Sequence, residues 1–344
     1  MNKRDKYTTL RKVGNMEQLC YIRKVRYQGG FADTQAAHEV NNGRLSFTVM
    51  DTACMDIGEV RYRNVPVSYL SKAGWQGNRS MPKRYIMGGM FFTAGLNHVG
   101  PGEGDMPLHG LARLLPGSNV CAKAGWQGGE YRMSVEGEMR QGMLFGENLV
   151  LRRSIVTTMD SDVIRITDVL ENEGFKDETV MLLYHFNVGY PILDEGACLV
   201  VPSKTYTPRD QATVESRGDT DPFVMDGPVD NQPEQVYYHE LGCDKKGDTF
   251  CALVNKEKKL AVCLHFNKTQ LPVFSQWKSI ASGDYVMGME LGICHVEGPQ
   301  REREMGSARV LKAGETMEIA IDLEILEGNE AIEKLFALGE TLKK

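Results

Sequence analysis

The chain has 344 residues, of which 42% are hydrophobic, and its formal net charge is −6. This length can bury a large core. The mild acidity argues against a nucleic-acid surface, which needs clustered Lys and Arg, and gives no support for membrane-surface binding. No apolar run approaches the ~20 residues that span a bilayer. The basic N-terminus has no apolar segment after it, so we expect no secretory signal.

The eight cysteines are scattered along the chain, and none forms a Cys-x-x-Cys pair. Neither a zinc ribbon nor a redox motif is therefore indicated. Cys121, Cys251 and Cys263 lie in or beside apolar runs, where a free cysteine behaves as a small hydrophobe. The sequence predicts a cytoplasmic protein without disulfides.

The first part of the chain gives few clear signals. Residues 1–42 are polar and weakly patterned, and 16–27 fit a strand pair or a short helix equally well. Residues 45–50 alternate apolar and polar, which is the period of a half-buried strand. Residues 60–69 are expected to hold one or two more strands.

A six-residue stretch, 72–77, recurs as 123–128. Two copies are too few for a repeat architecture. We attribute this recurrence to coincidence or to similar turn chemistry. The alternative is a pair of loops that place Trp75 and Trp126 on one rim, where a flat ring suits a sugar.

Residues 95–110 form a turn-rich segment with five glycines, two prolines and the histidines His98 and His109. This composition excludes a regular helix or a central strand. Loops held by a rigid scaffold often carry binding and catalysis, while the plainer interpretation is a surface connection.

From residue 130 to 190 the pattern is typical of successive short strands. Turn residues separate the apolar or alternating runs at short intervals, which is the signature of an all-β sandwich or barrel. A βαβ fold would need helical patterns between the strands, and none is found here. The strands are expected at 131–136, 149–157, 163–170 and 180–186.

The remainder begins with residues 201–240, which are rich in Pro, Asp and Gln and are predicted to be loops. Asn329 is expected to cap a terminal helix from 330 to about 342. No segment resembles a linker, so we expect one domain over 1–344, with the less patterned segment 1–42 at its start. Further strands are predicted at 250–254, 260–266, 286–291 and 317–326.

Two polar residues break the strand pattern. His185 closes an apolar strand, and Asn187, two residues later, points to the same face; the alternative is a satisfied core histidine. Glu290 lies in an apolar, glycine-flanked run, where a carboxylate is costly unless it is paired or functional. Burial would raise its pKa toward neutrality, as suits a general base; the alternative is a structural ion pair. Trp277 and Lys278 precede Glu290 in the sequence and offer an aromatic face and a cation.

The other histidines carry weaker signals. His265 precedes a polar turn and is expected at the surface or at a sheet edge. No His-x-His, His-Glu-x-x-His or EF-hand pattern occurs, so the sequence predicts no metal site.

Taken together, several segments resemble the aldose 1-epimerase (galactose mutarotase-like) superfamily, and in particular its uncharacterised branch, which is described by a domain of unknown function. The likeness spans roughly residues 40–325. It implies an all-β fold, the galactose mutarotase-like β-supersandwich of antiparallel strands, with a sugar cleft on one sheet face. Relatives in this branch carry Arg after the His-Gly pair and often Pro after the late Glu, where this chain has Leu111 and Leu291. The segments that carry the resemblance are 55–58, 95–100, 108–110, 184–196, 276–278 and Glu290.

The resemblance also implies roles. Glu290 would be the base that takes the proton of the anomeric hydroxyl, and His185 the acid that protonates the ring oxygen. His109 would hydrogen-bond the sugar, and no cofactor is required. The cations Lys278 and Arg84 would suit a substrate that is an acidic or phosphorylated sugar. The alternative is that both are surface charges. The candidates for binding hydroxyls or a substrate anion are Asn97, His98, Asn187, Arg84 and Lys278.

The resulting hypothesis is a cytoplasmic mutarotase-like isomerase that acts on a small sugar, an aldose or a sugar acid, without nucleic acid or membrane partners. The oligomeric state stays open, a homo-oligomer included. Two alternatives remain: a non-catalytic carbohydrate-binding or sensing protein on the same fold, since fold does not fix function, and a lyase or isomerase that acts on a sugar acid.

Overall fold

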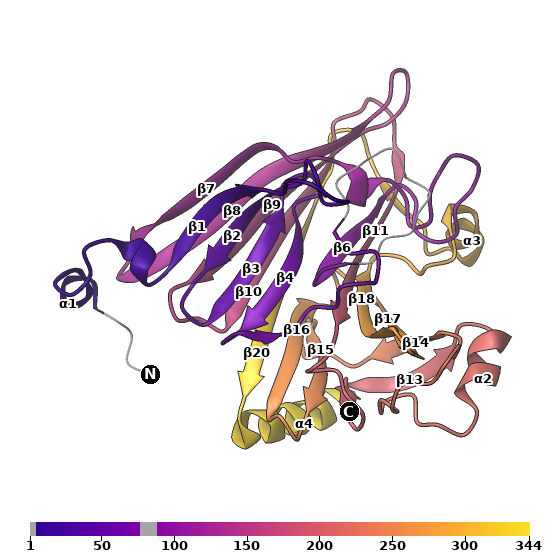
Figure 1. Cartoon of the computed structure of the whole chain (residues 1–344). Helices are drawn as coiled ribbons and strands as arrows, with labels where there is room; N and C mark the ends of the chain where they lie inside the picture. The colour runs from indigo at the N-terminus through magenta and orange to yellow at the C-terminus, as the bar shows by residue number, and fades with distance from the viewer. Residues whose placement is uncertain (1–4, 76–87) are drawn as a thin grey trace.

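The computed structural model describes residues 5–75 and 88–344, and its strands form three antiparallel sheets (Figure 1). The first sheet has five strands in the order β1 (Tyr21–Arg26), β2 (Ala36–Asn41), β3 (Leu45–Met50), β4 (Asp56–Tyr62) and β5 (Val65–Pro66). The second has eight, in the order β12 (Cys198–Val200), β15 (Asp248–Asn255), β16 (Leu260–Asn267), β20 (Thr316–Glu327), β10 (Val163–Asn172), β9 (Asn148–Thr158), β8 (Glu130–Gly142) and β7 (Ser118–Gln127).

The third sheet contains the candidate site. Six of its strands follow the order β13 (Ser203–Pro208), β14 (Gln235–Leu241), β17 (Val273–Ala281), β18 (Asp284–Gly292), β11 (Glu178–Val188) and β19 (Arg309–Leu311), and β6 (Phe91–Leu96) also pairs with β11. The helices are short: α1 (Lys6–Leu10), α2 (Gln211–Arg217), α3 (Pro299–Met305) and α4 (Asn329–Lys343), with 3-10 turns η1 (Met16–Gln18) and η2 (Ala112–Leu114).

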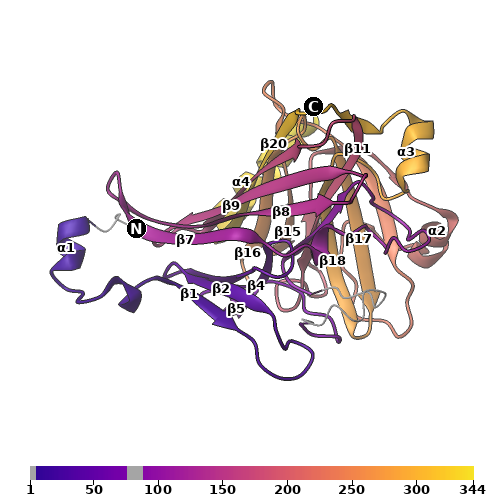
Figure 2. The ribbon, with the colours of Figure 1, turned by 90° about the horizontal axis from the view of Figure 1, so that it is seen from above.

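The five-stranded and seven-stranded sheets lie side by side and pack on one face of the eight-stranded sheet (Figures 1 and 2). The strands alternate inward apolar residues with outward polar ones, as in β10, where Ile164, Ile166 and Leu170 are buried and Arg165 is exposed. Their inward faces form one large hydrophobic cluster. This architecture confirms the predicted all-β supersandwich.

One polar group crosses that core. Arg153 of β9 is fully buried and donates two hydrogen bonds to Asp168 of β10, at 2.9 and 2.6 Å. It also donates to Asp56 of β4 at 2.7 Å and to Thr93 of β6 at 2.9 Å, while Tyr184 of β11 donates to Asp168 at 2.6 Å. A single guanidinium thus joins strands of all three sheets. We call these five side chains the buried Arg153 network.

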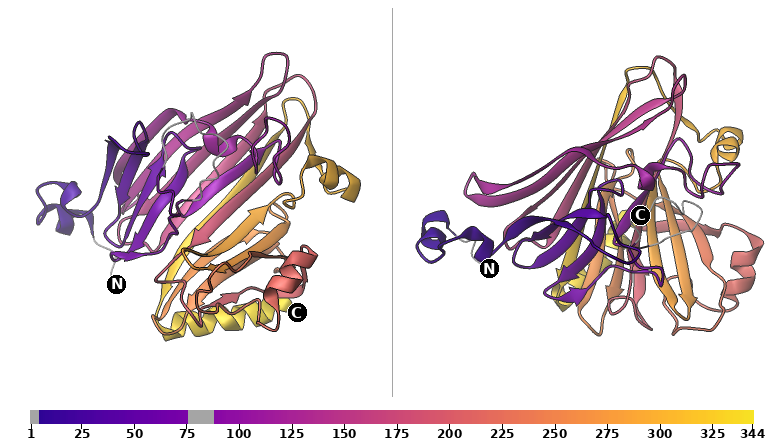
Figure 3. Two further views of the ribbon diagram at one scale, coloured as in Figure 1. Left: turned by 45° about the vertical axis from the view of Figure 1, so that its right-hand side comes forward. Right: turned by 45° about the horizontal axis from the view of Figure 1, so that its top comes forward.

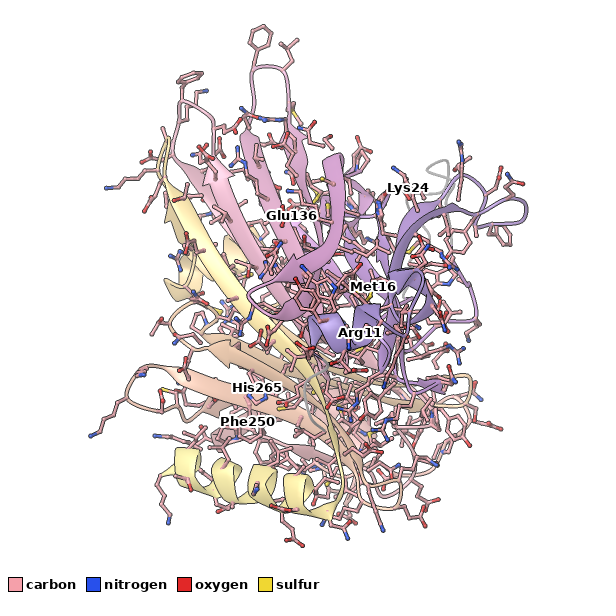
Figure 4. All side chains as sticks on the ribbon, turned by 90° about the vertical axis from the view of Figure 1, so that its left-hand side faces the viewer. Arg11, Met16, Lys24, Glu136, Phe250 and His265 are labelled. Atoms are coloured by element: carbon pink, nitrogen blue, oxygen red, sulfur yellow. The ribbon has the colours of Figure 1, made fainter. Side chains whose placement is uncertain are left out.

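The terminal helix α4 packs on the outer face of the eight-stranded sheet, where Ile332 and Leu335 contact Phe250 and Ala252 of β15 (Figures 3 and 4). The predicted helix is confirmed, but the cap is one residue earlier. Gly328 is the N-cap and makes no side-chain capping bond.

Several sequence-based expectations were wrong or are now resolved. The predicted loops at 201–240 contain β13, α2 and most of β14, and residues 16–27 form η1 followed by β1. Trp126 lies in strand β7, not in a loop. His265 lies on interior strand β16, with its half-buried imidazole on the outer face of the sheet, 2.9 Å from Glu324 (Figure 4). In the described ranges, no helix combines the length and the apolar character needed to cross a bilayer.

Candidate active site

The register of the third sheet brings His185 and Glu290 together. His185 of β11 and Glu290 of β18 are direct cross-strand partners, so both side chains project from the same face. His185 Nε2 lies 3.1 Å from Glu290 Oε1, and both side chains are almost completely buried. The preceding residue, Tyr184, points to the opposite face and joins the buried Arg153 network, which places the pair on the outer side of the sandwich.

Aromatic rings fix the position of the His185 imidazole. Phe92, its cross-strand neighbour on β6, stacks on it with ring centroids 4.6 Å apart and an interplanar angle of 21°. Trp277 of β17 presents an edge at 5.5 Å. Gly288 lies beneath both rings. A Cβ at this position would come within 3.1 Å of His185 Cε1 and 3.0 Å of Trp277, so a larger residue would displace one of the rings. The imidazole is therefore held by packing on several sides.

The charge state of Glu290 differs from the sequence-based expectation. Burial acts to raise the pKa of this carboxyl, but the charge and hydrogen bond of the neighbouring His185 imidazole, with smaller effects of His109 and Arg209, together outweigh burial, so the pKa lies below its ordinary value. The expected shift toward neutrality is therefore wrong in direction. Glu290 is a carboxylate at neutral pH and can accept a proton.

His109 completes the cluster from the loop at 95–110. Its ring centroid lies 6.3 Å from that of His185. Burial lowers the pKa of His109 to about 4, so the ring is neutral at pH 7. Its Nδ1 lies 3.2 Å from the backbone nitrogen of Gly100 and accepts that N–H, which leaves the proton of the neutral ring on Nε2. His109 is thus a hydrogen-bond donor at Nε2.

The loop reaches this position through close backbone approaches. Gly110 has φ 78°, and a Cβ there would lie 2.3 Å from the carbonyl oxygen of His98. Only glycine satisfies both demands. The loop begins two residues later than predicted, because Gly95 and Leu96 are the end of β6 and pair with β11.

Within the part of the chain that the structure describes, three buried polar atoms on the site face have no hydrogen-bond partner: His185 Nδ1, Asn187 Oδ1 and Ser275 Oγ. Ser275 is the cross-strand neighbour of Glu290, and Asn187 follows His185 on the same face, as predicted. Buried polar atoms are normally paired. Unpaired ones beside a carboxylate suit a ligand that carries several hydroxyl groups.

Two predicted binding residues do not reach this cluster. Lys278 lies on the opposite face of β17, and its ammonium donates to the carbonyls of Asp221 and Val224 and to the carboxylate of Asp226, at 3.1, 2.6 and 3.0 Å. It anchors the 221–226 loop, so its assignment to the sugar site was wrong. Arg84 lies outside the described residues.

Two more of the predicted binding residues, His98 and Asn97, lie in the loop itself and stabilise it. His98 Nε2 lies 2.7 Å from the carbonyl oxygen of Pro101 and braces the segment from within. The Asn97 amide makes a long contact of 3.5 Å with Glu147, a residue of the turn between β8 and β9. Asn187 donates to the carbonyl of His185 at 3.0 Å and is fully buried.

Sequence reasoning missed Phe92 and Ser275. Ser275 and Trp277 alternate along β17 with inward residues, which was a usable signal, but the strand itself was not predicted. Phe92 carried no signal of its own. Next to it is a cavity of about 100 Å³ that Trp75 and Arg113 also line. Residues 5–75 and 88–344 contain no group of His, Cys, Asp or Glu side chains placed to hold a metal ion.

Comparisons with known proteins agree with this fold. A proposed aldose 1-epimerase from Klebsiella pneumoniae superposes with a TM-score of 0.87 at 20% identity, over 96% of this chain and 91% of that one. A galactose mutarotase-like protein from Clostridium acetobutylicum gives 0.64 at 13% identity, over 90% and 100%. Galactose 1-epimerase from Lactobacillus acidophilus gives 0.58 at 13%, also over 90% and 100%. No curated protein sequence matches the chain.

At these identities the solved structures establish the galactose mutarotase-like fold. A family model with the description "domain of unknown function", DUF4432, matches residues 33–325. Since this match covers most of the chain, the protein belongs to the DUF4432 family.

Proposed function

We propose that this protein is an aldose 1-epimerase-like isomerase, which interconverts the anomers of a sugar by acid/base opening of the ring. The buried pair of His185 and Glu290, 3.1 Å apart on one sheet face, is the observation that carries the proposal. The similar folds of galactose 1-epimerase and of related proteins support the same reaction class.

The geometry suits the chemistry of a hemiacetal. The anomeric hydroxyl and the ring oxygen are bonded to the same carbon, so a base for one and an acid for the other must lie close together. Glu290 takes the hydroxyl proton, the bond from C1 to the ring oxygen breaks as the carbonyl forms, and the His185 imidazolium gives its Nε2 proton to the ring oxygen. After rotation about C1–C2 the steps run in reverse on the other face of the carbonyl.

The proton count balances in both directions. The pair holds one proton throughout, first on His185 beside the Glu290 carboxylate and then on Glu290 beside neutral His185. No net proton is exchanged with solvent in a cycle. The low pKa of Glu290 favours the carboxylate, which is the form that takes the proton of the anomeric hydroxyl.

His109 is a poor alternative to His185 as the acid, because its pKa of about 4 leaves it without a proton to spare at neutral pH. We assign it a positioning role, in which Nε2–H donates to a sugar oxygen. Ser275 and Asn187 would accept or donate further hydroxyl hydrogen bonds through their unpaired atoms. Asn97 and His98 hold the loop that carries His109.

The test is NMR anomer-exchange spectroscopy on a panel of aldoses and uronates. We expect Glu290→Gln and His185→Asn each to lower the exchange rate by a factor of about 10² to 10⁴. His239→Asn is the matched control, because His239 is equally buried but faces the opposite side of the same sheet, where it contacts Gln276. Its exchange rate should match the wild type once stability is corrected for.

Two results would contradict the proposal. Sugar binding without any exchange in the wild type would indicate a binding or sensing protein. Exchange that is unchanged in both site variants would show that this pair is not the acid and base.

A further inference from the structure

Two turns at one end of the sandwich expose large apolar side chains. In the turn between β8 and β9, Met143, Leu144 and Phe145 are 65%, 82% and 93% exposed, and Phe175 in the turn between β10 and β11 is 99% exposed. Leu144, Phe145 and Phe175 are the three most exposed large hydrophobic side chains among the described residues. Figures 1 and 3 show both turns at the same end of the long strands. We call these four side chains the apolar tip.

The two turns are fixed to each other at their bases. The backbone N–H of Glu173 donates to the carbonyl of Asn148 at 2.9 Å. Arg140 donates to the side chains of Asn148 and Glu173 at 2.7 and 2.6 Å. The carbonyl of Met143 accepts the N–H of Gly146 at 3.0 Å, which closes the first turn. Hydrogen bonds therefore hold the backbone of both turns in place, and the apolar side chains are exposed in this ordered conformation.

The conformation of Phe145 adds a separate observation. Its φ is 62°, in the left-handed region that favours glycine or asparagine and that a bulky residue adopts at a cost. The fold of one chain gains nothing from an aromatic ring there, because that ring is 93% exposed. A strained and exposed aromatic side chain is understandable if it is buried by something else.

We propose that the apolar tip is the interface between two copies of this chain, which meet through a two-fold contact. A fully exposed aromatic side chain offers about 150–250 Å². The two phenylalanines therefore expose on the order of 300–500 Å² per copy, and Met143 and Leu144 add to this area, so a contact that buries all four side chains of both copies approaches the lower limit of a stable interface, about 1,200 Å² in total. In such a contact each tip is its own complement.

Charge decides between a second copy and a lipid surface. Residues 142–146 carry no ionisable side chain, so this turn of one copy can meet the same turn of another copy without like charges opposed. The neighbouring charges are mixed and include the acids Glu147, Glu173 and Asp177. A loop that inserts into an anionic membrane would need a basic collar, which this mixture does not provide.

Sedimentation velocity of the full chain over a wide concentration range tests this proposal. The wild type should sediment as a dimer and the double variant Leu144→Asp/Phe145→Asn as a monomer, since asparagine tolerates the left-handed position. Phe31→Asp is the matched control, because Phe31 is 63% exposed in the turn between β1 and β2, outside the tip. It should leave the dimer intact.

A second measurement reports the symmetry. In a two-fold contact, a residue near the axis meets its own copy, so Leu144→Cys should form a disulfide-linked dimer under mild oxidation. The wild type, with exposed Cys121 and Cys243, gives the background. A monomeric wild type, a dimer that persists in the double variant, or flotation of the wild type with phosphatidylcholine vesicles that the double variant abolishes would each overturn the proposal.

Discussion

Replacing Arg153 with Met should be among the most destabilising single changes in this protein. The side chain is fully buried, and its five N–H groups make five hydrogen bonds, two of them to Asp168 and one each to Asp56, Thr93 and the carbonyl of Cys54. Met fills a similar volume but leaves two carboxylates without their cation. Breaking a buried ion pair in this way costs about 3–5 kcal/mol.

The cost should depend on pH in a defined direction. Burial raises the pKa of Asp56 even though Arg153 acts to lower it. A carboxyl with a raised pKa in the folded state contributes stability at low pH and loses that contribution as the pH rises through the folded pKa. Without Arg153 this loss is larger, so the difference in unfolding free energy between wild type and variant should widen from acidic to neutral pH.

Urea unfolding followed by circular dichroism measures this difference, provided that the m-values agree. Arg165→Met is the matched control, because Arg165 makes a similar bidentate ion pair with Asp322 on the neighbouring strand, but its side chain is 62% exposed. Its loss should be below about 1 kcal/mol. If Arg153→Met does not fold, Arg153→Lys, which keeps the charge but not the planar fork, should show a smaller loss. Equal losses in Arg153→Met and Arg165→Met would refute the reasoning.

Three further predictions concern the site. Gly288→Ala places a Cβ 3.1 Å from His185 Cε1, so exchange measured by NMR should fall about tenfold to a hundredfold, while Gly125→Ala, in open space, should have no effect. The rate should stay level on the acid side until the pH falls below the ordinary pKa of a glutamate side chain, because the pKa of Glu290 is lowered; a fall in rate centred near neutrality would contradict its role as base. Urea unfolding at several pH values should show stability falling from pH ~6.5 to ~4, since unfolded His109 binds a proton that the folded ring, with a pKa of about 4, resists. His109→Gln should lose less stability over that window, and equal slopes would show that His109 is not the group involved.

Strand periodicity predicted most of the sandwich, because its strands bury one face and expose the other. Residues 45–50 coincide with β3, and β9, β10, β16 and β20 were found within a few residues. The failures have physical causes. β7 has no buried face to create an alternating pattern, since it is an exposed edge strand. β13 and β14 are short and lie among connections rich in Pro and Asp. The composition of these connections dominated the segment, so the whole of 201–240 was predicted as loops.

For the site, the sequence identified polar residues that were out of place in strands, but it could not give their partners. Glu290 and His185 stood out because each interrupts an apolar run, and the structure brings them together. Lys278 was assigned to the wrong face of its strand. The alternation of side chains along a strand separates two faces, but it does not indicate which face carries the site. The low pKa of Glu290 depends on a neighbour 105 positions away along the chain, so burial alone gave the wrong direction.

The alternation along β11 has a consequence for how errors in this fold are detected. Tyr184 and His185 are neighbours, yet one belongs to the buried Arg153 network and the other to the site. A slip of β11 by one residue would exchange their faces and leave Asp168 without its phenol and Glu290 without its imidazole at the same time. A chain with β11 in the wrong register would therefore also lack a properly closed core. Only one register of β11 both completes the buried Arg153 network and places the His185 imidazole in the proposed site. Molecules that fold stably are therefore also the ones in which the proposed acid is correctly positioned.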